Sequence, residues 1–398
     1  MLLGIFSDTH LGYGSDDRKE ETFNRFKEAI DIFKQKNVDF ILHAGDLFDH
    51  AVPDQETWLE AFKVFQNNEG KTSLIQKNKN GIIQNVVVKG IPIIAIHGTH
   101  EHRGKDFANA IDILEKSNCL CHVHIGYAIL EKDSEKVFIH GMGGVPEKFA
   151  KKVFENYSPK PIQNSINLLL LHQSFTEFLP FDDDSIASLS LSDLPKGFDL
   201  IINGHLHWIS EQNLDGINFL LCGSTIYTQM KSLESKKEKG IFLFDTILKK
   251  LEFVPFKIQR KLFYEKISFV DAKPEEVIDL VHSKINSILS NSFELKPLIR
   301  FKLVGTLVKG FSQKDISFSL PEDKAIFSIT KTFEVDSFKK KINSLKELQS
   351  EKKSINEIGI NLLEKNVDEA GLKEFDTREV FLLLSENELE KAERELLK

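Results

Sequence analysis

Short apolar runs alternate along the chain with longer stretches in which apolar side chains recur every three or four residues. The first pattern is typical of a buried strand and the second of an amphipathic helix. Residues 17–36 show the second pattern, because Phe23, Phe26, Ile30 and Phe33 share one helical face. The first 116 residues are therefore predicted to form a βαβαβ unit. Its predicted strands cover residues 1–6, 38–43 and 91–96. Its predicted helices cover residues 17–36, a stretch from 53 onward, and residues 107–116.

The pattern changes along the rest of the chain. Residues 67–85 are polar and contain glycine, which predicts an insertion or a mobile connection. Between 122 and 256, short strands follow one another quickly, which predicts two packed sheets with helices outside. From about residue 261, a strand, an amphipathic helix and a second strand suggest a separate small module: 263–269, 274–289 and 298–304.

These patterns predict an α/β fold in three parts: a two-sheet sandwich flanked by helices over 1–257, a small α/β domain over 258–334 and a helical segment over 335–398. Capping-box spacing predicts that two helices of the last segment begin at Asp376 and Ser385. The segment is rich in leucine near its end. Those leucines either pack back on their own core or dock another protein: Leu382, Leu383, Leu384, Leu389, Leu396 and Leu397.

Composition narrows the class of protein. With 28% charged and 41% hydrophobic residues in 398, the chain is typical of a soluble globular protein of two or three domains, and its apolar runs are too short for a membrane span. Three cysteines provide no disulfide framework, which indicates a reducing compartment. A net charge of −8 neither requires nor excludes nucleic acid as a partner.

Metal-binding residue types follow several of the predicted strands. His205 and His207 come just after an apolar run that stops at Gly204, and residues two apart in an extended segment point the same way. Alone, this pair is more often found as surface histidines on a turn. The arrangement recurs, however, and the candidate metal ligands are Asp8, His10, Asp46, His172, His205 and His207, with Thr99 and His100 beside them.

Mixed imidazole and carboxylate ligands suit manganese, iron or zinc. Asp46 is the natural bridging carboxylate, because the preceding glycine turn exposes both of its oxygens. Two metals at such a site stabilise the attacking and leaving oxygens of a phosphate displacement, and His100 is the candidate to protonate the leaving oxygen. The motif Cys119-x-Cys121-His122-x-His124 also resembles a metal cluster, but on a strand its side chains would point to both faces.

Five blocks together resemble the calcineurin-type metallophosphoesterase signature: Asp8-x-His10, Gly45-Asp46, Gly98-x-His100, His172 and Gly204-His205-x-His207. Residues 8–13 and 45–49 further resemble the double-strand-break repair nucleases of the Mre-eleven/SbcD family. This resemblance implies a metallophosphoesterase nuclease core over 1–257, a DNA-capping domain over 258–334 and an ATPase-binding helical segment over 335–398.

The resemblance also implies site roles and partners. It assigns Asp8, His10, Asp46 and His207 to one Mn²⁺, assigns Asp46, His172 and His205 to a second, and makes His100 the transition-state histidine. It implies 3′→5′ exonuclease and endonuclease action on DNA, a homodimer, and a coiled-coil ABC-type ATPase partner of the SbcC type. Candidate phosphate contacts are Arg103, Lys105, Lys148, Lys151 and Lys152. The expected location is the cytoplasm, at the nucleoid in a prokaryote.

Two positions depart from the family pattern. Thr99 stands where the family has an asparagine ligand of the second metal, and Asp49 stands where many members have histidine. The core ligands do not specify the substrate, so two alternatives to the nuclease stay open. One is a phosphatase or cyclic-nucleotide phosphodiesterase on the same fold, and the other is a weakly catalytic or non-catalytic scaffold that tethers DNA ends.

Overall fold

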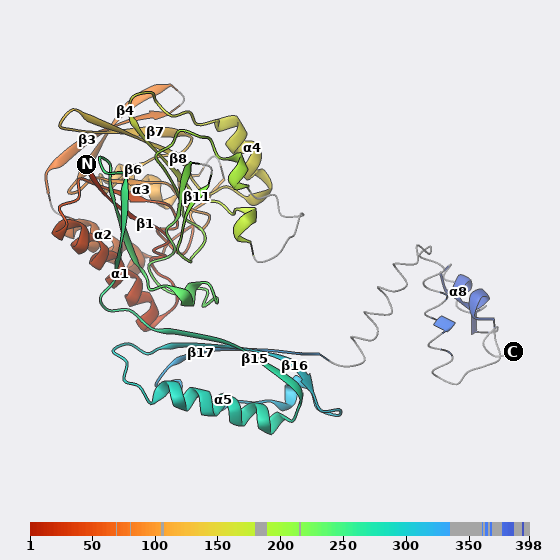
Figure 1. The fold of residues 1–398 in the computed structure, drawn as a ribbon. Coiled ribbons are helices and arrows are strands. Elements are labelled where there is room, and N and C mark those ends of the chain that lie inside the picture. The colour runs from red at the N-terminus through yellow and green to blue at the C-terminus, as the bar shows by residue number, and fades with distance from the viewer. Residues whose placement is uncertain are drawn as a thin grey trace. The chain divides into compact units, whose positions relative to one another are not determined.

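A computed structural model describes residues 1–68, 70–79, 81–104, 107–179, 189–214 and 216–334, and beyond these only 360, 363–364, 367, 376–385 and 392–393 (Figure 1). The chain divides into two compact units. The first contains Met1–Glu265, Asn291–Arg300 and Pro321–Ser328, and the second contains Lys266–Ser290, Phe301–Leu320 and Ile329–Lys398.

Two sheets form the first unit. The six-stranded sheet has the order β14-β13-β1-β2-β5-β6, with bounds Lys250–Pro255, Gly240–Asp245, Leu2–Phe6, Phe40–His43, Ile93–Ala95 and Cys121–His122. The eight-stranded sheet has the order β11-β12-β10-β9-β8-β7-β3-β4, with bounds Ser210–Leu214, Ile217–Leu221, Leu200–Asn203, Ile166–Leu171, Glu135–Met142, Gly126–Lys132, Thr72–Lys79 and Ile82–Lys89.

The alternation of side chains along each strand explains the layers. Leu3 and Ile5 of β1 pack in one buried cluster with Leu168 and Leu170 of β9, so this cluster lies between the sheets. Ile41 of β2 belongs instead to a second cluster, in which the outer face of the six-stranded sheet packs against helices. Those helices are α1 (Asp16–Gln35), α2 (Gln55–Asn67) and α3 (Ala110–Lys116), and α1 and α2 lie side by side (Figure 1).

A third apolar cluster covers the outer face of the eight-stranded sheet. It joins Ala150 and Phe154 of α4 (Glu147–Tyr157) to Leu169 and Leu171 of β9. Where the connections of this unit are described, they contain the short 3₁₀ helices η1 (Thr176–Phe178), η2 (Leu191–Asp193) and η3 (Glu234–Lys236). The predicted α/β two-sheet sandwich flanked by helices is thereby confirmed.

The second unit contains most of a three-stranded sheet of order β15-β16-β17, with bounds Leu262–Ala272, Leu298–Leu307 and Ile326–Glu334. The amphipathic helix α5 (Pro274–Leu289) has the bounds expected from its pattern, and it buries Val277, Val281 and Ile285 along one face. A short η4 (Gln313–Asp315) precedes β17. The three-part domain division remains a prediction.

Helix α8 (Thr377–Ser385) begins where the capping box predicts, because Oδ1 of Asp376 accepts the backbone N–H groups of Arg378 and Glu379. Val380 is buried, whereas Leu382 and Leu384 are exposed. The helix predicted to begin at Ser385 and the leucines at 389, 396 and 397 lie outside the described residues.

For residues 67–85, the alternative of a mobile connection is wrong. β3 and β4 form a hairpin at the edge of the eight-stranded sheet, and β3 also pairs with β7. The second half of β3 is polar, whereas β4 is largely apolar although six of its eight side chains are exposed. Neither strand therefore shows the strict alternation of apolar and polar residues that marks a half-buried strand. The turn contains Asn78, whose side chain accepts the N–H of Gly81, and the positive φ of +81° at this glycine suits such a turn.

Candidate metal centre

The candidate ligands follow strands whose carboxyl ends meet. β1, β2 and β5 are parallel neighbours in one sheet, and β9 and β10 are parallel neighbours in the other. Carboxyl ends of parallel strands share one edge of a sheet, so the loops that follow them collect there. Asp8, Asp46, His100, His172 and His205 lie in these five loops.

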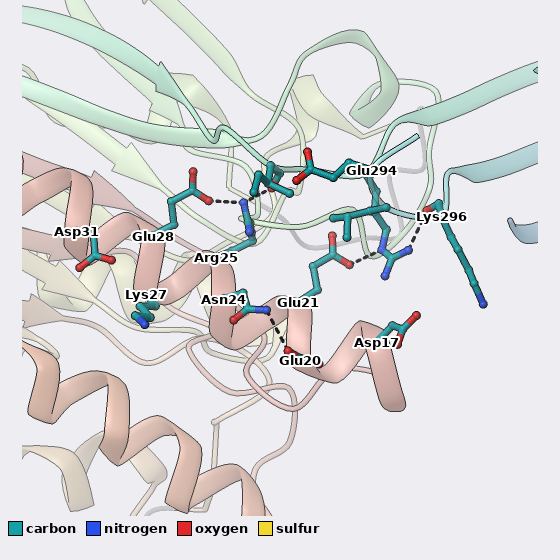
Figure 2. Close-up of a pocket in the computed structure, with 13 residues that line it drawn as sticks. Asp17, Glu20, Glu21, Asn24, Arg25, Lys27, Glu28, Asp31, Glu294 and Lys296 are labelled. Carbon is teal, nitrogen blue, oxygen red and sulfur yellow. Dashed lines mark hydrogen bonds and ion pairs between the residues drawn. The ribbon is translucent and has the colours of Figure 1, made fainter. Parts of the chain in front are cut away.

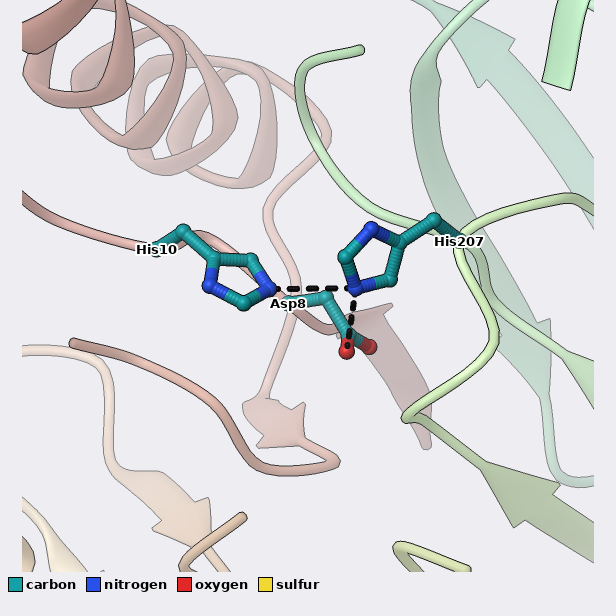
Figure 3. A group of neighbouring side chains, drawn as sticks. All are labelled: Asp8, His10 and His207. Carbon is teal, nitrogen blue, oxygen red and sulfur yellow. Dashed lines mark hydrogen bonds and ion pairs between the residues drawn. The ribbon is translucent and has the colours of Figure 1, made fainter. Parts of the chain in front are cut away.

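Asp8, His10 and His207 form the first group of potential ligands, and all three are buried (Figure 3). The Nε2 atoms of His10 and His207 are 3.1 Å apart, and Nε2 of His207 is 3.6 Å from Oδ1 of Asp8. The other ring nitrogens face oxygens: Nδ1 of His10 is 3.0 Å from Oδ1 of Asp49, and Nδ1 of His207 contacts the hydroxyl of Thr228. Such contacts orient a histidine so that its free nitrogen faces a metal.

Asp46, His172 and His205 form the second group. Nε2 of His172 lies 3.0 Å from Oδ2 of Asp46. Nδ1 of His172 is 2.7 Å from the carbonyl oxygen of Ala44, and because a carbonyl only accepts, this nitrogen carries the proton. The hydroxyl of Thr99 is 3.5 Å from Nδ1 of His205, so Thr99 borders this group.

His100 lies beside both groups. Its backbone N–H donates to Oδ1 of Asp46 at 2.9 Å, and its Nδ1 is 2.6 Å from the carbonyl oxygen of Asp49. Its side chain is 43% exposed, whereas those of His172 and Asp46 are at most 1% exposed. His100 is therefore accessible to a substrate in a way that the buried ligands are not.

His205 and His207 belong to different groups, although alternation along an extended strand predicts that both imidazoles reach one point. The reason is the backbone of His205, whose φ of 72° is left-handed and breaks the alternation. Asp8, His10 and Asp46 also have positive φ, at 50°, 45° and 51°. Non-glycine residues in this region cost free energy and gather at functional sites.

Glycine at two motif positions is explained by close packing. A Cβ at Gly98 would lie 2.0 Å from Oδ1 of Asp46, and a Cβ at Gly45 would lie 2.4 Å from Nδ1 of His172. Gly45 also has a φ of +94°. Any side chain at either position would displace a residue of the second group.

Burial and neighbouring charges set the protonation of the two groups. Burial raises the pKa of Asp8 to about 6, although the charge of His172 opposes this. Burial opposes the charged form of His172, but the adjacent Asp46 raises its pKa to about 9, and His172 in turn lowers the pKa of Asp46. Burial and the charge of His172 lower the pKa of His205 to about 4. His205 is therefore a neutral imidazole at pH 7, as a metal ligand must be.

The donor sets fit divalent metal ions. Nε2 of His172 is buried and has no hydrogen-bond partner, although a carboxylate oxygen lies close to it. A neutral His172 would therefore direct a lone pair at Asp46, and a cation between the two atoms would satisfy both. Each group offers two imidazoles and one carboxylate, a set that suits manganese, iron or zinc.

Two carboxylates of this region were not recognised as site residues from the sequence, the half-buried Asp49 and the buried Glu101. Asp49 contacts His10 and is part of a third group with His10 and His100. Glu101 is fully buried, and its two oxygens accept the N–H groups of Phe48 at 2.7 Å and Gly98 at 2.6 Å. It thereby connects the loops after β2 and β5. The signal in the sequence was position, because Asp49 ends the block 45–49 and Glu101 directly follows the block Gly98-x-His100.

The candidate DNA contacts come from two segments, with Lys148, Lys151 and Lys152 on α4 and Arg103 in the loop between β5 and α3. Arg103 packs over Phe107 and donates to the carbonyl of Ala108, and Lys151 is 3.1 Å from Asp193. Lys148 lies over the ring of Phe149, and Lys152 is exposed on α4. Lys105 lies outside the described residues. The structure leaves the DNA-binding role of these residues a prediction.

Two other features of the described chain contain none of the candidate ligands. Cys119 and Cys121 have pKa values raised by burial, and His122 pairs with Asp112 at 2.8 Å, so this motif forms a packed polar cluster. A hollow of about 710 Å³ lies along α1 (Figure 2). Charged residues that line it pair with one another, as Arg260 does with Glu21.

Comparison with known proteins agrees with this architecture. The calcineurin-like phosphoesterase family matches residues 1–208, just over half of the 398-residue chain, and the protein belongs to this family. Within it, the chain is 27% identical over 337 residues to the DNA double-strand break repair protein Mre11 of Thermoplasma acidophilum, covering 81% of each chain. It is 29% identical over 321 residues to Mre11 of Sulfolobus acidocaldarius, covering 77% of this chain and 76% of the relative.

These two matches confirm the resemblance to the Mre11/SbcD family that the motifs indicate. Among solved structures, that of TT1561 of Thermus thermophilus covers 64% of this chain and 98% of its own, at 11% identity and a TM-score of 0.39. Within the described residues, no helix is long and apolar enough to cross a membrane.

Proposed function

We propose that the protein is a metal-dependent DNA nuclease that processes double-strand-break ends, with two Mn²⁺ ions as cofactors. The observation that carries the proposal is the pair of ligand groups, Asp8–His10–His207 and Asp46–His172–His205, with the exposed His100 beside both. The names of the Mre11 relatives supply the substrate class.

The residues divide the chemistry between them. Two divalent ions, when bound, activate a water molecule and stabilise the charge that develops on a phosphodiester in an in-line displacement. Asp46 is proposed to bridge the two ions and the other five ligands to hold one ion each. Because Nδ1 of His100 donates to a carbonyl oxygen, its Nε2 is the nitrogen that exchanges a proton with the leaving oxygen.

The test is a cleavage assay on linear duplex DNA and on short single strands with Mn²⁺, run beside hydrolysis of nitrophenyl phosphate. Release of nucleotides from 3′ ends together with internal cuts supports the exonuclease and endonuclease activities. Hydrolysis of nitrophenyl phosphate without DNA cleavage would instead indicate a phosphatase or phosphodiesterase. Binding and bridging of DNA ends without cleavage would indicate the tethering scaffold, which Thr99 favours because it weakens the ligand set.

We further propose a coiled-coil ABC-type ATPase as partner, bound through residues 335–398. The exposed Leu382 and Leu384 of α8 support this, since they give a helix of this segment an apolar surface. Deleting residues 336–398 should leave cleavage of short oligonucleotides intact and abolish capture of the ATPase in a pull-down. A truncated chain that retains the ATPase as tightly as the full chain contradicts the assignment.

A homodimer is also proposed, and light scattering on the purified chain tests it directly. The proposal rests on the family resemblance carried by the motifs. The proposed place of action is wherever the DNA lies, which is the nucleoid if the source is a prokaryote.

A further inference from the structure

A lysine buried in the first unit contacts the backbone of a candidate metal ligand. Lys239 lies immediately before β13 and is only 2% exposed. Its Nζ donates to the carbonyl oxygen of His207 at 2.7 Å, to the hydroxyl of Ser224 at 2.9 Å and to Oε1 of Glu234 at 3.0 Å. Lysine is almost never fully buried unless it is paired, because removing an ammonium from water is costly.

All three donors of this ammonium are used within the protein. Glu234, which is 1% exposed, balances its charge and also accepts the N–H of Lys231. The ring of Tyr227 lies 4.8 Å from Nζ, and this favours a cation at that point. Lys239 therefore has no donor left for a substrate.

The contact joins the two sheets. β13 belongs to the six-stranded sheet, whereas His207 follows β10 of the eight-stranded sheet. Other residues between β12 and β13 contact the same group of ligands, because Thr228 contacts the ring of His207 and the N–H of Thr225 donates to the carbonyl of Asp8. The backbone and the ring of His207 are thus both held from this segment.

We propose that Lys239 is a positioning residue for the first ligand group, which fixes the main chain of His207 so that its imidazole meets Asp8 and His10. The role rests on the proposed metal centre. Among the described contacts of Lys239, none reaches a side chain of the second group. The two groups should consequently differ in their dependence on this lysine.

The test is a calorimetric titration of the full chain with Mn²⁺, accompanied by thermal unfolding. Lys239→Met would leave Glu234 buried without a countercharge, so the informative form is the double variant Lys239→Met/Glu234→Gln, which removes both charges. Lys261→Met is the matched control, since Lys261 forms an exposed ion pair with Glu238 at 2.7 Å in the same unit. The double variant should lose roughly 10–100-fold in affinity at one Mn²⁺ site and keep the other, while the control keeps both.

A second variant covers the case in which the double variant does not fold. Lys239→Arg keeps a positive charge opposite Glu234, but its planar guanidinium cannot reproduce the three contacts of Nζ, so it should weaken the same single site. Unchanged affinities in either folded variant overturn the proposal, as does an equal weakening of both sites, which would indicate only general support of the fold. A wild-type chain that binds no Mn²⁺ overturns the metal centre itself and the role of Lys239 with it.

Discussion

His172 directs Nε2 at Oδ2 of Asp46 across 3.0 Å, while its Nδ1 donates to the carbonyl oxygen of Ala44. Without a metal ion, this pair needs a proton between the two atoms, and the lowered pKa of Asp46 places that proton on the imidazole. The carboxylate of Asp46 stabilises the imidazolium, and the pKa of His172 is therefore raised to about 9. A metal ion must therefore displace a proton from His172.

Metal binding is accordingly expected to release protons at neutral pH. At pH 7.5, which lies below the pKa of about 9, the metal-free His172 is an imidazolium, and its conversion to a ligand releases about one proton per chain. The affinity for Mn²⁺ should increase with pH until about 9. Calorimetric titrations in buffers of different ionisation enthalpy measure the released protons, and a heat of binding independent of the buffer would contradict this.

The raised pKa of His172 also makes the stability of the metal-free protein depend on pH. The folded-state pKa of His172 exceeds its ordinary value of 6.5, so its pair with Asp46 stabilises the fold fully below about pH 6.5. That contribution is lost as pH rises through about 9. Denaturant unfolding at pH 6, 8 and 10 in the presence of a chelator provides the check.

His207→Ala should reduce DNA cleavage by more than about 100-fold, because it removes a ligand of the first group. Folding and binding of duplex DNA should persist, since binding depends on dispersed contacts with phosphates. Parallel gel-shift and cleavage assays measure the two effects. Equal loss of both activities in a folded variant would argue against His207 as a ligand.

His100→Ala should lower kcat by about 10²–10⁴-fold, the usual contribution of a general acid, while both Mn²⁺ affinities stay the same. The reason is that its side chain belongs to neither of the two main ligand groups, and its backbone contact with Asp46 survives the substitution. Single-turnover cleavage combined with metal titration separates these quantities. A reduced metal affinity would make His100 a ligand instead.

Thr99→Asn should decrease the Mn²⁺ concentration that gives half-maximal cleavage by roughly 10–100-fold. The amide oxygen of asparagine reaches one atom further than the threonine hydroxyl, which already lies 3.5 Å from Nδ1 of His205. Titrations of cleavage rate and of bound metal test this, with Thr99→Val as the isosteric control. Identical affinities in wild type and Thr99→Asn would show that this position does not limit the second site.

Glu101→Ala should destabilise the protein by about 2–4 kcal/mol, because it leaves the buried N–H groups of Phe48 and Gly98 without acceptors. It should also impair cleavage, since Glu101 connects the loops that carry Asp46 and His100. Glu101→Gln retains one acceptor oxygen and should reduce both the stability and the cleavage rate less than Glu101→Ala does. Denaturant unfolding measures the change in stability, and a wild-type unfolding midpoint for Glu101→Ala would show that Glu101 does not stabilise the two loops.

Much of this fold is determined locally and could be predicted from the sequence. The helical spacing of Phe23, Phe26 and Phe33 places one face of α1 against the core, and the apolar runs of β1, β9 and β10 mark strands that are buried on both faces. Metal-binding residue types at the ends of such runs lie at a shared sheet edge, because parallel strands all end there. The hairpin β3–β4 escaped prediction because polar residues surround its turn and neither strand alternates strictly, although β4 is rich in isoleucine and valine.

The sequence by itself determined which residue types stand at the strand ends, but the tertiary structure decided which of them meet. His205 and His207 are two residues apart, yet the left-handed backbone at His205 separates them, and His207 faces Asp8 and His10 from nearly two hundred positions away. Likewise, nothing in the local pattern connects Lys239 to His207. Such pairings depend on the packing of one sheet against the other, which brings together segments that have no relation along the chain.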